Sequence, residues 1–363
     1  MEIIKEIVTY QQVIEGYTLD GDNFDIGAYT LKPPIKKVFL ENPNLKDTSK
    51  CMIFFDRIDG LICGRQMFFP TKVKVGEKIV EAQSGSSLQT VEEYRQYAVG
   101  MDMINYPIKT KEYPIIIYGG ISTMIKPIYK ALRFHLFEIP SYWQPRNSQF
   151  LLQYIGIKGL LLKILTACCN LILKPIIGII NSRIKYKYKR YNVNKLDVVP
   201  QWVDDIIFKD SHKYAEVHDR NWMQWTLDNN FFSKEYESQS FYEITEKGQK
   251  LGFFMINERN SNQAEHNIDS VIFGSVYEWG SFNEKILPEE VIHQIAFTKF
   301  SKHVDIAISA SNNNSFSKVM RNMFAFKHGN ASVVVKDLSK AYKDIGDIDN
   351  WRLRMGYCDT PFY

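Results

Sequence analysis

The sequence lacks the residue patterns of several common enzyme classes. Its 363 residues contain no HExxH pair and no other histidine spacing that is typical of zinc ligands, so no metal site is expected. Neither a GxSxG nucleophile elbow nor a P-loop is present. The five cysteines form no CxxC pair and are odd in number, which favours free thiols in a reducing compartment.

The sequence also lacks a large excess of charge of either sign. The net charge is +4, from 45 basic and 41 acidic residues, so the composition does not indicate a nucleic-acid binder. Residues 1–6 lack the basic start and apolar core of a signal peptide, which favours a cytoplasmic location. A content of 45% hydrophobic and 24% charged residues predicts a folded chain, and its length favours two domains of about 150 residues.

Turn signals predict an antiparallel meander near the N-terminus. Residues from about 35 to 80 are interpreted as strands, with a hairpin turn at Asp59-Gly60 and another turn at residues 76–78. Residues 87–91 continue as a strand, and residues 99–104 open an apolar helix. The order is therefore meander, turn and helix.

A buried strand and a second helix are expected next. Residues 115–118 are apolar and end at Gly119-Gly120, which suits a buried strand. Ser122 is a suitable N-cap for a helix through Lys130.

The turn before the first of these helices is a candidate phosphate-binding loop. Small residues at Ala98 and Gly100 allow a ligand to approach the backbone, and a helix N-terminus offers unpaired N–H groups and a partial positive charge. The spacing Arg95-x-x-Ala98-x-Gly100 resembles the acyl-CoA loop Q/R-x-x-G-x-G/A of the GNAT superfamily of N-acyltransferases. Alanine replaces the first glycine of that motif.

A second motif follows about thirty residues later in the order typical of GNAT proteins. Tyr129-x-x-Leu132-Arg133-Phe134 resembles the Y-x-x-L-G-F helix ending, with Arg133 in place of glycine. The resemblance covers roughly residues 35–145. It implies that acetyl-CoA or another acyl-CoA is the co-substrate, and that Tyr129 protonates the leaving thiolate.

The same resemblance implies a set of cofactor-binding residues. The backbone of the loop would hold the pyrophosphate, and the Val91 N–H is the candidate donor to the thioester oxygen. The expected cofactor-binding residues are Val91, Arg95, Gln96, Tyr97, Ala98, Val99 and Gly100. Three acids near strand ends are candidate general bases, but none is assigned this role: Glu81, Glu138 and Glu278.

An apolar and basic segment separates the two halves of the chain. Residues 159–180 are strongly apolar, with Lys163, Thr166, Asn170 and Lys174 on one stripe of a helix that Pro175 should break or kink. A basic, tyrosine-rich run follows at residues 183–190. Three alternatives are a buried linker helix, a helix on a membrane surface through residues 159–190, and a membrane span, against which two lysines and a proline argue.

The second half repeats the order of strands and helices. A hairpin is expected around Lys247-Gly248, a strand at 271–273, a helix at 288–300, a buried strand at 305–309 and a helix at 315–323. Residues 219–225 resemble the R-D-x-x-x-L-x-W-R-Y helix of two-lobed acetyltransferase-like proteins, with Thr226 where arginine is common. The tail at residues 351–359 resembles their W-x-L-x-x-G-D-x-D ending, with Tyr357 in place of the first aspartate.

These features together predict an α/β protein with tandem GNAT-like domains, each a central mixed sheet flanked by helices. The expected division is an N-terminal lobe with the acyl-CoA loop at 1–148, a helical insert or linker at 149–195, and a C-terminal lobe without that loop at 196–363. The expected function is acyl transfer from acyl-CoA to a small-molecule amine, with no nucleic-acid partner, by a cytoplasmic protein that is peripheral at the inner face of the membrane if residues 159–190 contact lipid. The alternatives are a Fem-type aminoacyl transferase, which does not need an intact CoA loop, and a non-catalytic binding or scaffold protein on the GNAT fold.

Overall fold

A computed structural model describes residues 2–229, 238–263, 268–313 and 315–358. The first half contains β1 (Ile3–Thr9), α1 (Tyr10–Ile14), η1 (Ala28–Leu31), α2 (Pro33–Leu40), β2 (Cys51–Ile58), β3 (Leu61–Val75), β4 (Lys78–Thr90), η2 (Glu92–Tyr97), α3 (Val99–Thr110), β5 (Ile115–Gly119), α4 (Lys126–Ala131), β6 (His135–Pro145) and α5 (Ser148–Tyr154). The remainder contains α6 (Gly159–Lys187), β7 (Asn192–Leu196), α7 (Val203–Phe208), β8 (Tyr214–Glu216), α8 (Arg220–Asp228), β9 (Ser238–Glu246), β10 (Gln249–Gln263), β11 (Ile268–Ser281), α9 (Glu289–Phe297), β12 (Ile306–Ala310), α10 (Phe316–Asn322), β13 (Phe326–Asp337) and η4 (Ile348–Asn350). The predicted mixed α/β architecture is confirmed.

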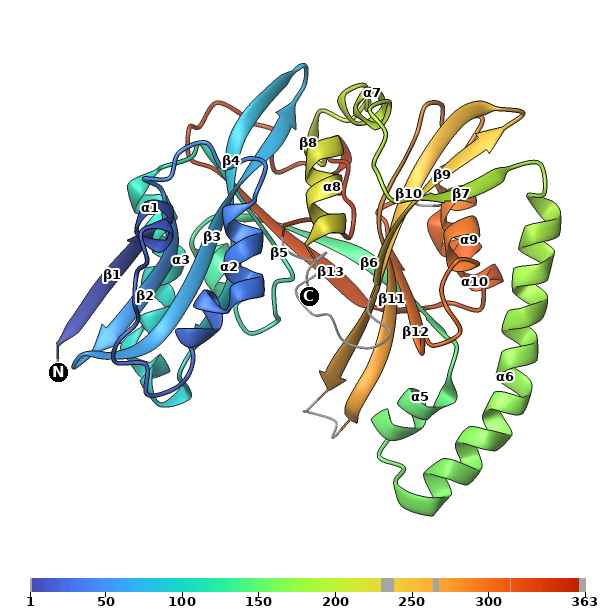
Figure 1. The fold of residues 1–363 in the computed structure, drawn as a ribbon, viewed down its shortest axis with the longest axis horizontal. Coiled ribbons are helices and arrows are strands. Elements are labelled where there is room, and N and C mark those ends of the chain that lie inside the picture. The colour runs from blue at the N-terminus through green and yellow to red at the C-terminus, as the bar shows by residue number, and fades with distance from the viewer. Residues whose placement is uncertain (1, 230–237, 264–267, 314, 359–363) are drawn as a thin grey trace.

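One mixed sheet runs through both halves of the molecule (Figure 1). Its order is β1-β2-β3-β4-β5-β13-β6-β12-β11-β10-β9-β7, and β8 pairs with β3 outside this path. The halves exchange a strand at the centre: β13, from the C-terminal part, lies between β5 and β6, while β6 pairs with β12. The division of the chain at residues 148 and 196 stays a prediction, and two strands cross between the parts that it separates.

Local turn chemistry explains the two long hairpins. Asp59 and Gly60 have φ of 49° and 82°, and Lys247 and Gly248 have φ of 49° and 81°. Positive φ at both central residues is the type I′ geometry, whose twist matches that of the flanking strands. Both predicted hairpins are therefore confirmed, as β2–β3 and β9–β10.

Three local predictions need correction. Part of the segment interpreted as strand is helix α2, because Pro33 and Pro34 suit the first helical positions and Ile35, Val38 and Phe39 bury one helical face. The helix expected from Ser122 begins only at Lys126, with Ile125 at the N-cap. The expected break at Pro175 is wrong, because α6 continues through that residue to Lys187.

The expected tail motif is only partly within the described residues. Trp351 and Tyr357 are buried in the core, and Gly356 N–H donates to the Tyr277 carbonyl at 2.8 Å. Asp359, the last residue of the motif, lies outside the described residues.

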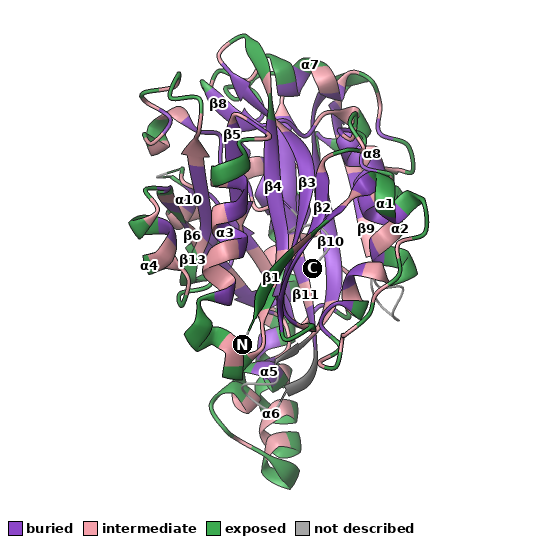
Figure 2. Ribbon diagram, turned by 90° about the vertical axis from the view of Figure 1, so that its left-hand side faces the viewer, coloured by how far each residue is buried: buried purple, intermediate pink, exposed green. Residues whose placement is uncertain are grey.

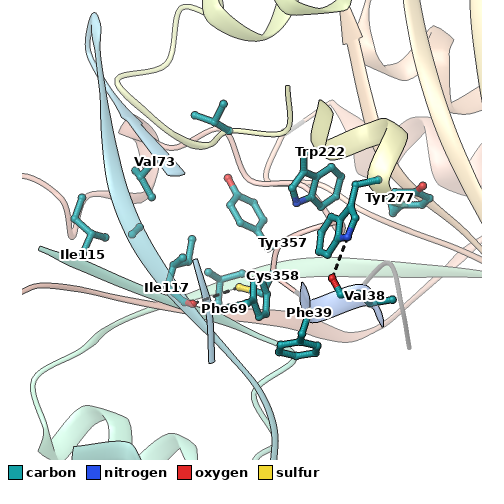
Figure 3. Packing of buried hydrophobic residues seen from close by; sticks show 14 of the residues in the cluster. Val38, Phe39, Phe69, Val73, Ile115, Ile117, Trp222, Tyr277, Tyr357 and Cys358 are labelled. Atoms are coloured by element: carbon teal, nitrogen blue, oxygen red, sulfur yellow. Dashed lines mark hydrogen bonds between the residues drawn. The ribbon is translucent and has the colours of Figure 1, made fainter. Parts of the chain in front are cut away.

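The largest hydrophobic core joins elements from both halves (Figure 3). The α8 residues Trp222 and Trp225 pack edge to face, and the Trp225 indole N–H donates to the Val38 carbonyl of α2 at 3.1 Å. Figure 2 shows that most buried residues lie on the strands of the sheet, whereas α6 and the turn before it are mostly exposed or half-buried. Because α2 and α8 share this core, the two halves are held together by apolar packing as well as by the sheet.

A buried charged cluster also joins the halves. His218 forms ion pairs with Glu278 of β11 and with Glu216 of β8, and its ring stacks on Trp222 at 3.6 Å. The Arg354 Nε lies 2.7 Å from Glu278 Oε1. Burial opposes the charge on His218, but Glu278 and Glu216 outweigh it and raise the pKa of His218 to about 9.

Candidate functional site

The predicted loop lies between the end of β4 and the start of α3. The 3-10 turn η2 leads to Ala98, which is the N-cap of α3. Val99 and Gly100 are the first two helical residues, so their N–H groups have no partner within the helix. Together with the helix dipole, they make this end of α3 suitable for an anion.

The loop side chains differ in exposure. Arg95, Gln96, Tyr97 and Ala98 are exposed, Val99 is buried and Gly100 is half-buried. The Arg95 Nε donates to Thr90 Oγ1 at 3.3 Å, and the Gln96 amide donates to the Glu93 carbonyl at 3.2 Å. The Arg95 guanidinium is therefore held beside the N-terminus of α3, where it adds positive charge.

Both positions at which this sequence has replaced a glycine of the GNAT motifs have a left-handed backbone. Ala98 has φ of 61°, and Arg133, after α4, has φ of 58°. In the second turn, the Phe134 N–H donates to the Tyr129 carbonyl at 3.0 Å, which closes the helix end. The backbone thus keeps the geometry that favours glycine although the side chains have changed.

We expect Ala98→Gly to stabilise the protein by about 0.5–1 kcal/mol, because a non-glycine residue with positive φ carries backbone strain that outweighs the greater entropy of glycine in the unfolded chain. Ala167→Gly, at an exposed position within α6, is the matched control and should destabilise by about 1 kcal/mol. Urea unfolding of both variants measures the change in the free energy of unfolding and its sign. Destabilisation by Ala98→Gly would show that the backbone at this position is not strained.

A groove follows the edge of β4 beyond the loop. The parallel pairing of β4 with β5 covers only Ala82–Ser84 and Ile115–Ile117, and the strands part after that point. A hollow of about 450 Å³ next to the loop is lined by residues that include Arg95, Ala98 and Gly100. A second hollow, of about 380 Å³, extends to Tyr118 and Tyr129, and both are lined by Leu88, Ser122 and Ile125. The groove therefore connects the loop with the two tyrosines.

An irregularity in β4 shapes this groove. The register with β3 shifts opposite Gln66, and Ser87 has φ of 53°, as in a β-bulge. After the bulge, the Val91 N–H donates to the Cys63 carbonyl at 2.8 Å. This N–H, the expected donor to the thioester oxygen, is therefore paired with β3 in this structure, and its role with a ligand stays a prediction.

Tyr129 lies at the far end of the groove from the loop. Its side chain is 2% exposed, and its ring contacts Tyr118 and Phe134 with centroid distances of 5.7 and 5.0 Å. Burial, followed by the nearby Cys358, raises the pKa of Tyr129 above its usual value. The Tyr129 hydroxyl therefore keeps its proton at neutral pH and is able to donate a hydrogen bond.

The inner end of the groove also holds polar atoms that sequence reasoning missed. The Tyr118 hydroxyl, the Gln66 Oε1 and the Ser84 Oγ are buried without a hydrogen-bond partner among the described residues. Tyr118 and Gln66 line the hollow, and Ser84 immediately precedes Gly85, which also lines it. Buried polar groups are usually paired, so a cluster of unpaired ones next to a hollow points to a ligand. Tyr118, the last large residue before Gly119-Gly120, was the available signal in the sequence.

The three acids considered as bases are engaged elsewhere. Glu81 pairs with Lys46 at 2.8 Å, and Glu138 pairs with Lys126 at 2.7 Å. Glu278 belongs to the buried charged cluster with His218. None of these acids is among the residues that line the two hollows of the groove.

The second half has a different helix N-terminus in the position of the loop. Helix α9 starts after Pro288 with Glu289 and Glu290 in its first turn. Two carboxylates there oppose the binding of a phosphate, whereas α3 begins with Val99 and Gly100. This difference agrees with an acyl-CoA loop in the N-terminal half and none at α9.

No protein-family model matches the chain, and no curated protein sequence matches it. Solved structures match its fold. A GCN5-related N-acetyltransferase from Anabaena variabilis has a TM-score of 0.54 at 9% identity, over 93% of this chain and 73% of that chain. N-myristoyltransferase from Saccharomyces cerevisiae with bound myristoyl-CoA has a TM-score of 0.53 at 12% identity, over 92% of this chain and 82% of that chain. A probable N-acyltransferase from Enterococcus faecalis has a TM-score of 0.52 at 10% identity, over 93% and 73%.

The chain therefore has a GNAT-like fold of the two-lobed type. This likeness extends over nearly the whole chain, whereas the motifs in the sequence covered only its first part.

Proposed function

We propose that this protein is an N-acyltransferase that moves an acyl group from acyl-CoA to a small-molecule amine, at one site in its N-terminal half. One observation carries the proposal: a single groove joins a helix N-terminus suited to pyrophosphate with buried polar atoms on β3, β4 and β5 that have no partner among the described residues. The solved structures with the same fold are N-acyltransferases or a probable one, which supports the general class of reaction.

The loop residues have separate roles in this proposal. The N–H groups of Val99 and Gly100 bind the pyrophosphate, and Arg95 adds its positive charge. The pantetheine arm lies in the groove where β4 and β5 part, and its amides pair with the open edge of β4. Gln96, Tyr97 and Ala98 form the turn that brings the backbone to the phosphates.

In the proposed reaction, the neutral amine attacks the thioester carbonyl carbon. The new C–N bond forms, the C–S bond breaks, and the CoA thiolate leaves. A tyrosine hydroxyl at the inner end of the groove donates a proton to the thiolate. Water takes the proton that the amine loses, and a proton from solvent restores the tyrosine hydroxyl. Tyr129 and Tyr118 both line this end, and within the described part of the chain the Tyr118 hydroxyl has no hydrogen-bond partner that it would have to give up.

The closed inner end favours a short acyl group. Tyr118 and Gln66 are each 2% exposed, and a Cβ atom on Gly85 would lie 2.7 Å from the Tyr118 ring. A long acyl chain would have to displace these packed side chains. The proposed donor is therefore acetyl-CoA.

The binding step is tested by thermal unfolding with acetyl-CoA. A ligand at about 100 times its Kd stabilises the native state by about 2.7 kcal/mol, which raises Tm by several degrees. Pantetheine, which lacks the pyrophosphate, is the matched control ligand and should give a much smaller shift. No shift with saturating acetyl-CoA would refute the acyl-CoA site and favour the Fem-type or scaffold alternatives.

Tyr118→Phe and Tyr129→Phe separate the two candidate proton donors. The donor's variant should lower kcat by about 10²–10³-fold with little change in acetyl-CoA affinity, because only the proton transfer is lost. Tyr106→Phe, which removes the hydroxyl of an α3 residue that donates to Glu112, is the control for loss of a buried tyrosine hydroxyl. The test uses thiol release with a panel of primary amines. Full turnover in both groove variants would exclude tyrosine as the acid.

A further inference from the structure

Helix α6 presents an apolar face to the outside of the molecule. Six of its aliphatic side chains are 51–77% exposed: Leu160, Leu161, Ile164, Leu171, Ile172 and Ile179. With 29 residues, α6 is long and apolar enough by composition to cross a membrane, yet only 6% of its apolar window is buried in the described structure. A contiguous apolar surface of this kind marks an interaction site.

The two uncharged residues of the polar stripe, Thr166 and Asn170, face the protein instead of the solvent. The Asn170 Oδ1 accepts from the backbone N–H and the hydroxyl of Ser148, both at 2.9 Å, and its amide donates to Asn147 Oδ1 at 2.9 Å. Thr166 is half-buried on the same side, and its carbonyl accepts from Ser148. This orientation is the reverse of that of a helix whose outer face is in water.

Lysines follow one border of the apolar face. Lys163, Lys174 and Lys185 are each eleven residues apart, and at about 100° per residue this spacing returns them to nearly the same side of the helix. All three are exposed. Lysines in such a row can extend their amines to lipid headgroups while their aliphatic stems lie against the apolar boundary.

The whole region is free of acidic residues. Between Glu138 and Asp197 the sequence has no aspartate or glutamate. The same stretch has ten basic residues: Arg146, Lys158, Lys163, Lys174, Arg183, Lys185, Lys187, Lys189, Arg190 and Lys195. The rest of the chain is therefore net acidic, and the positive charge is concentrated beside the apolar face, which complements an anionic surface.

The apolar surface continues onto the preceding helix α5 and its C-terminal end. Leu151, Tyr154 and Ile155 are 41%, 43% and 70% exposed. Figure 2 shows the start of α6 projecting below the rest of the molecule, next to α5. A flat surface can therefore reach this end without contact with the main sheet.

A basic hollow lies at the other end of α6. It has a volume of about 500 Å³ and is lined by residues that include Arg183 and Lys187, together with Ile180 and Met323. Basic groups over an apolar floor suit the headgroup of an anionic lipid.

We propose that α6 lies flat on an anionic lipid surface, such as the cytoplasmic leaflet of a membrane, with its outer face at the boundary between headgroups and acyl chains. A span across the bilayer is disfavoured, because Ile184 and Ile180 pack in the core of the second half and would have to leave it. Two lysines within the apolar stretch also oppose a span. The inference does not depend on the acyl-CoA site.

Vesicle co-sedimentation of the full chain tests this proposal. We expect strong binding to phosphatidylcholine vesicles that contain about a quarter phosphatidylserine, and weak binding to phosphatidylcholine alone. The double variant Leu171→Glu/Ile172→Glu should weaken binding to the anionic vesicles by more than about tenfold. Val198→Glu, which replaces another aliphatic residue, 65% exposed, outside this region, is the matched control and should bind as the parent does.

The lysine row is tested separately. Lys163→Gln/Lys174→Gln/Lys185→Gln should lose about fivefold in affinity per lysine on anionic vesicles and little on neutral ones. Far-ultraviolet circular dichroism and Tm of each variant establish that it is folded; these side chains are exposed, so neither should change.

Three outcomes would overturn the proposal. Absence of the parent protein from the anionic vesicle pellet refutes lipid binding. Retention in the membrane fraction after alkaline carbonate extraction indicates a span. A lipid-free dimer that the Leu171→Glu/Ile172→Glu variant converts to a monomer indicates that a second copy of the chain covers this face.

Discussion

Gly100→Glu is expected to abolish acyl-CoA binding, with a loss of affinity of about 100-fold or more. The residue is the second of α3, and its N–H is one of the unpaired donors at the helix N-terminus. A carboxylate at this point repels the pyrophosphate, and two unit charges about 4 Å apart near a protein surface interact by roughly 4 kcal/mol. Calorimetric titration with acetyl-CoA measures the loss.

The same substitution should leave the fold intact, which makes the result interpretable. Glutamate is favourable in the first turn of a helix because it complements the dipole. A Cβ atom at Gly100 would lie 3.3 Å from Thr90 Cγ2, a contact that a small movement of the methyl group relieves. The expected result is therefore a normal Tm without ligand and no increase when acetyl-CoA is added.

Two controls distinguish charge at the site from other effects. Gly100→Ala adds the Cβ atom without charge and should retain most of the affinity. Lys109→Glu changes the charge at the exposed far end of α3 by two units and should bind nearly as the parent does. Unchanged binding by Gly100→Glu would show that acyl-CoA does not use this loop.

The parts of the fold that were predictable are those that depend on neighbours in sequence. Asp59-Gly60 and Lys247-Gly248 define their hairpins locally, because the backbone at those positions needs positive φ. The loop at Ala98 was found in the same way, from small residues before an apolar helix. Helix α2, which was interpreted as strand, could also be predicted from nearby residues, since Pro33 and Pro34 suit the first positions of a helix.

The parts that were not predictable depend on contacts between distant residues. The exchange of β6 and β13 at the sheet centre has no local signal, because each strand has the same alternation whichever partner it takes. The occupied Val91 N–H follows from the bulge at Ser87 and the pairing with Cys63. The unpaired Tyr118 hydroxyl appears only when β4 and β5 part.

The buried cluster around His218 likewise depends on contacts between distant residues. Glu278→Gln, within this cluster, is expected to destabilise the protein by about 3 kcal/mol at neutral pH. Glu278 lies between His218 and Arg354, so its neutralisation leaves two buried cations with less compensation. Glu138→Gln, which affects a half-exposed pair with Lys126, is the control and should change stability by less than about 1 kcal/mol. Urea unfolding measures the change in the free energy of unfolding for both variants. Equal changes would show that the buried cluster contributes no more to stability than the surface pair.

The pH dependence of stability provides an independent readout of the same cluster. The pKa of His218 is about 9 in the folded protein and near 6.5 when unfolded, so its contribution is fully present below pH 6.5 and is lost as the pH rises through 9. Between pH 7.5 and 9.5 the loss should be about 2 kcal/mol. Burial and the nearby Asp102 raise the pKa of Asp56 to about 7. Most of the change in stability that Asp56 causes therefore occurs below pH 7.5. His218→Gln should remove most of this slope, whereas a slope that persists in the variant would assign it to other groups and leave His218 neutral in the folded protein.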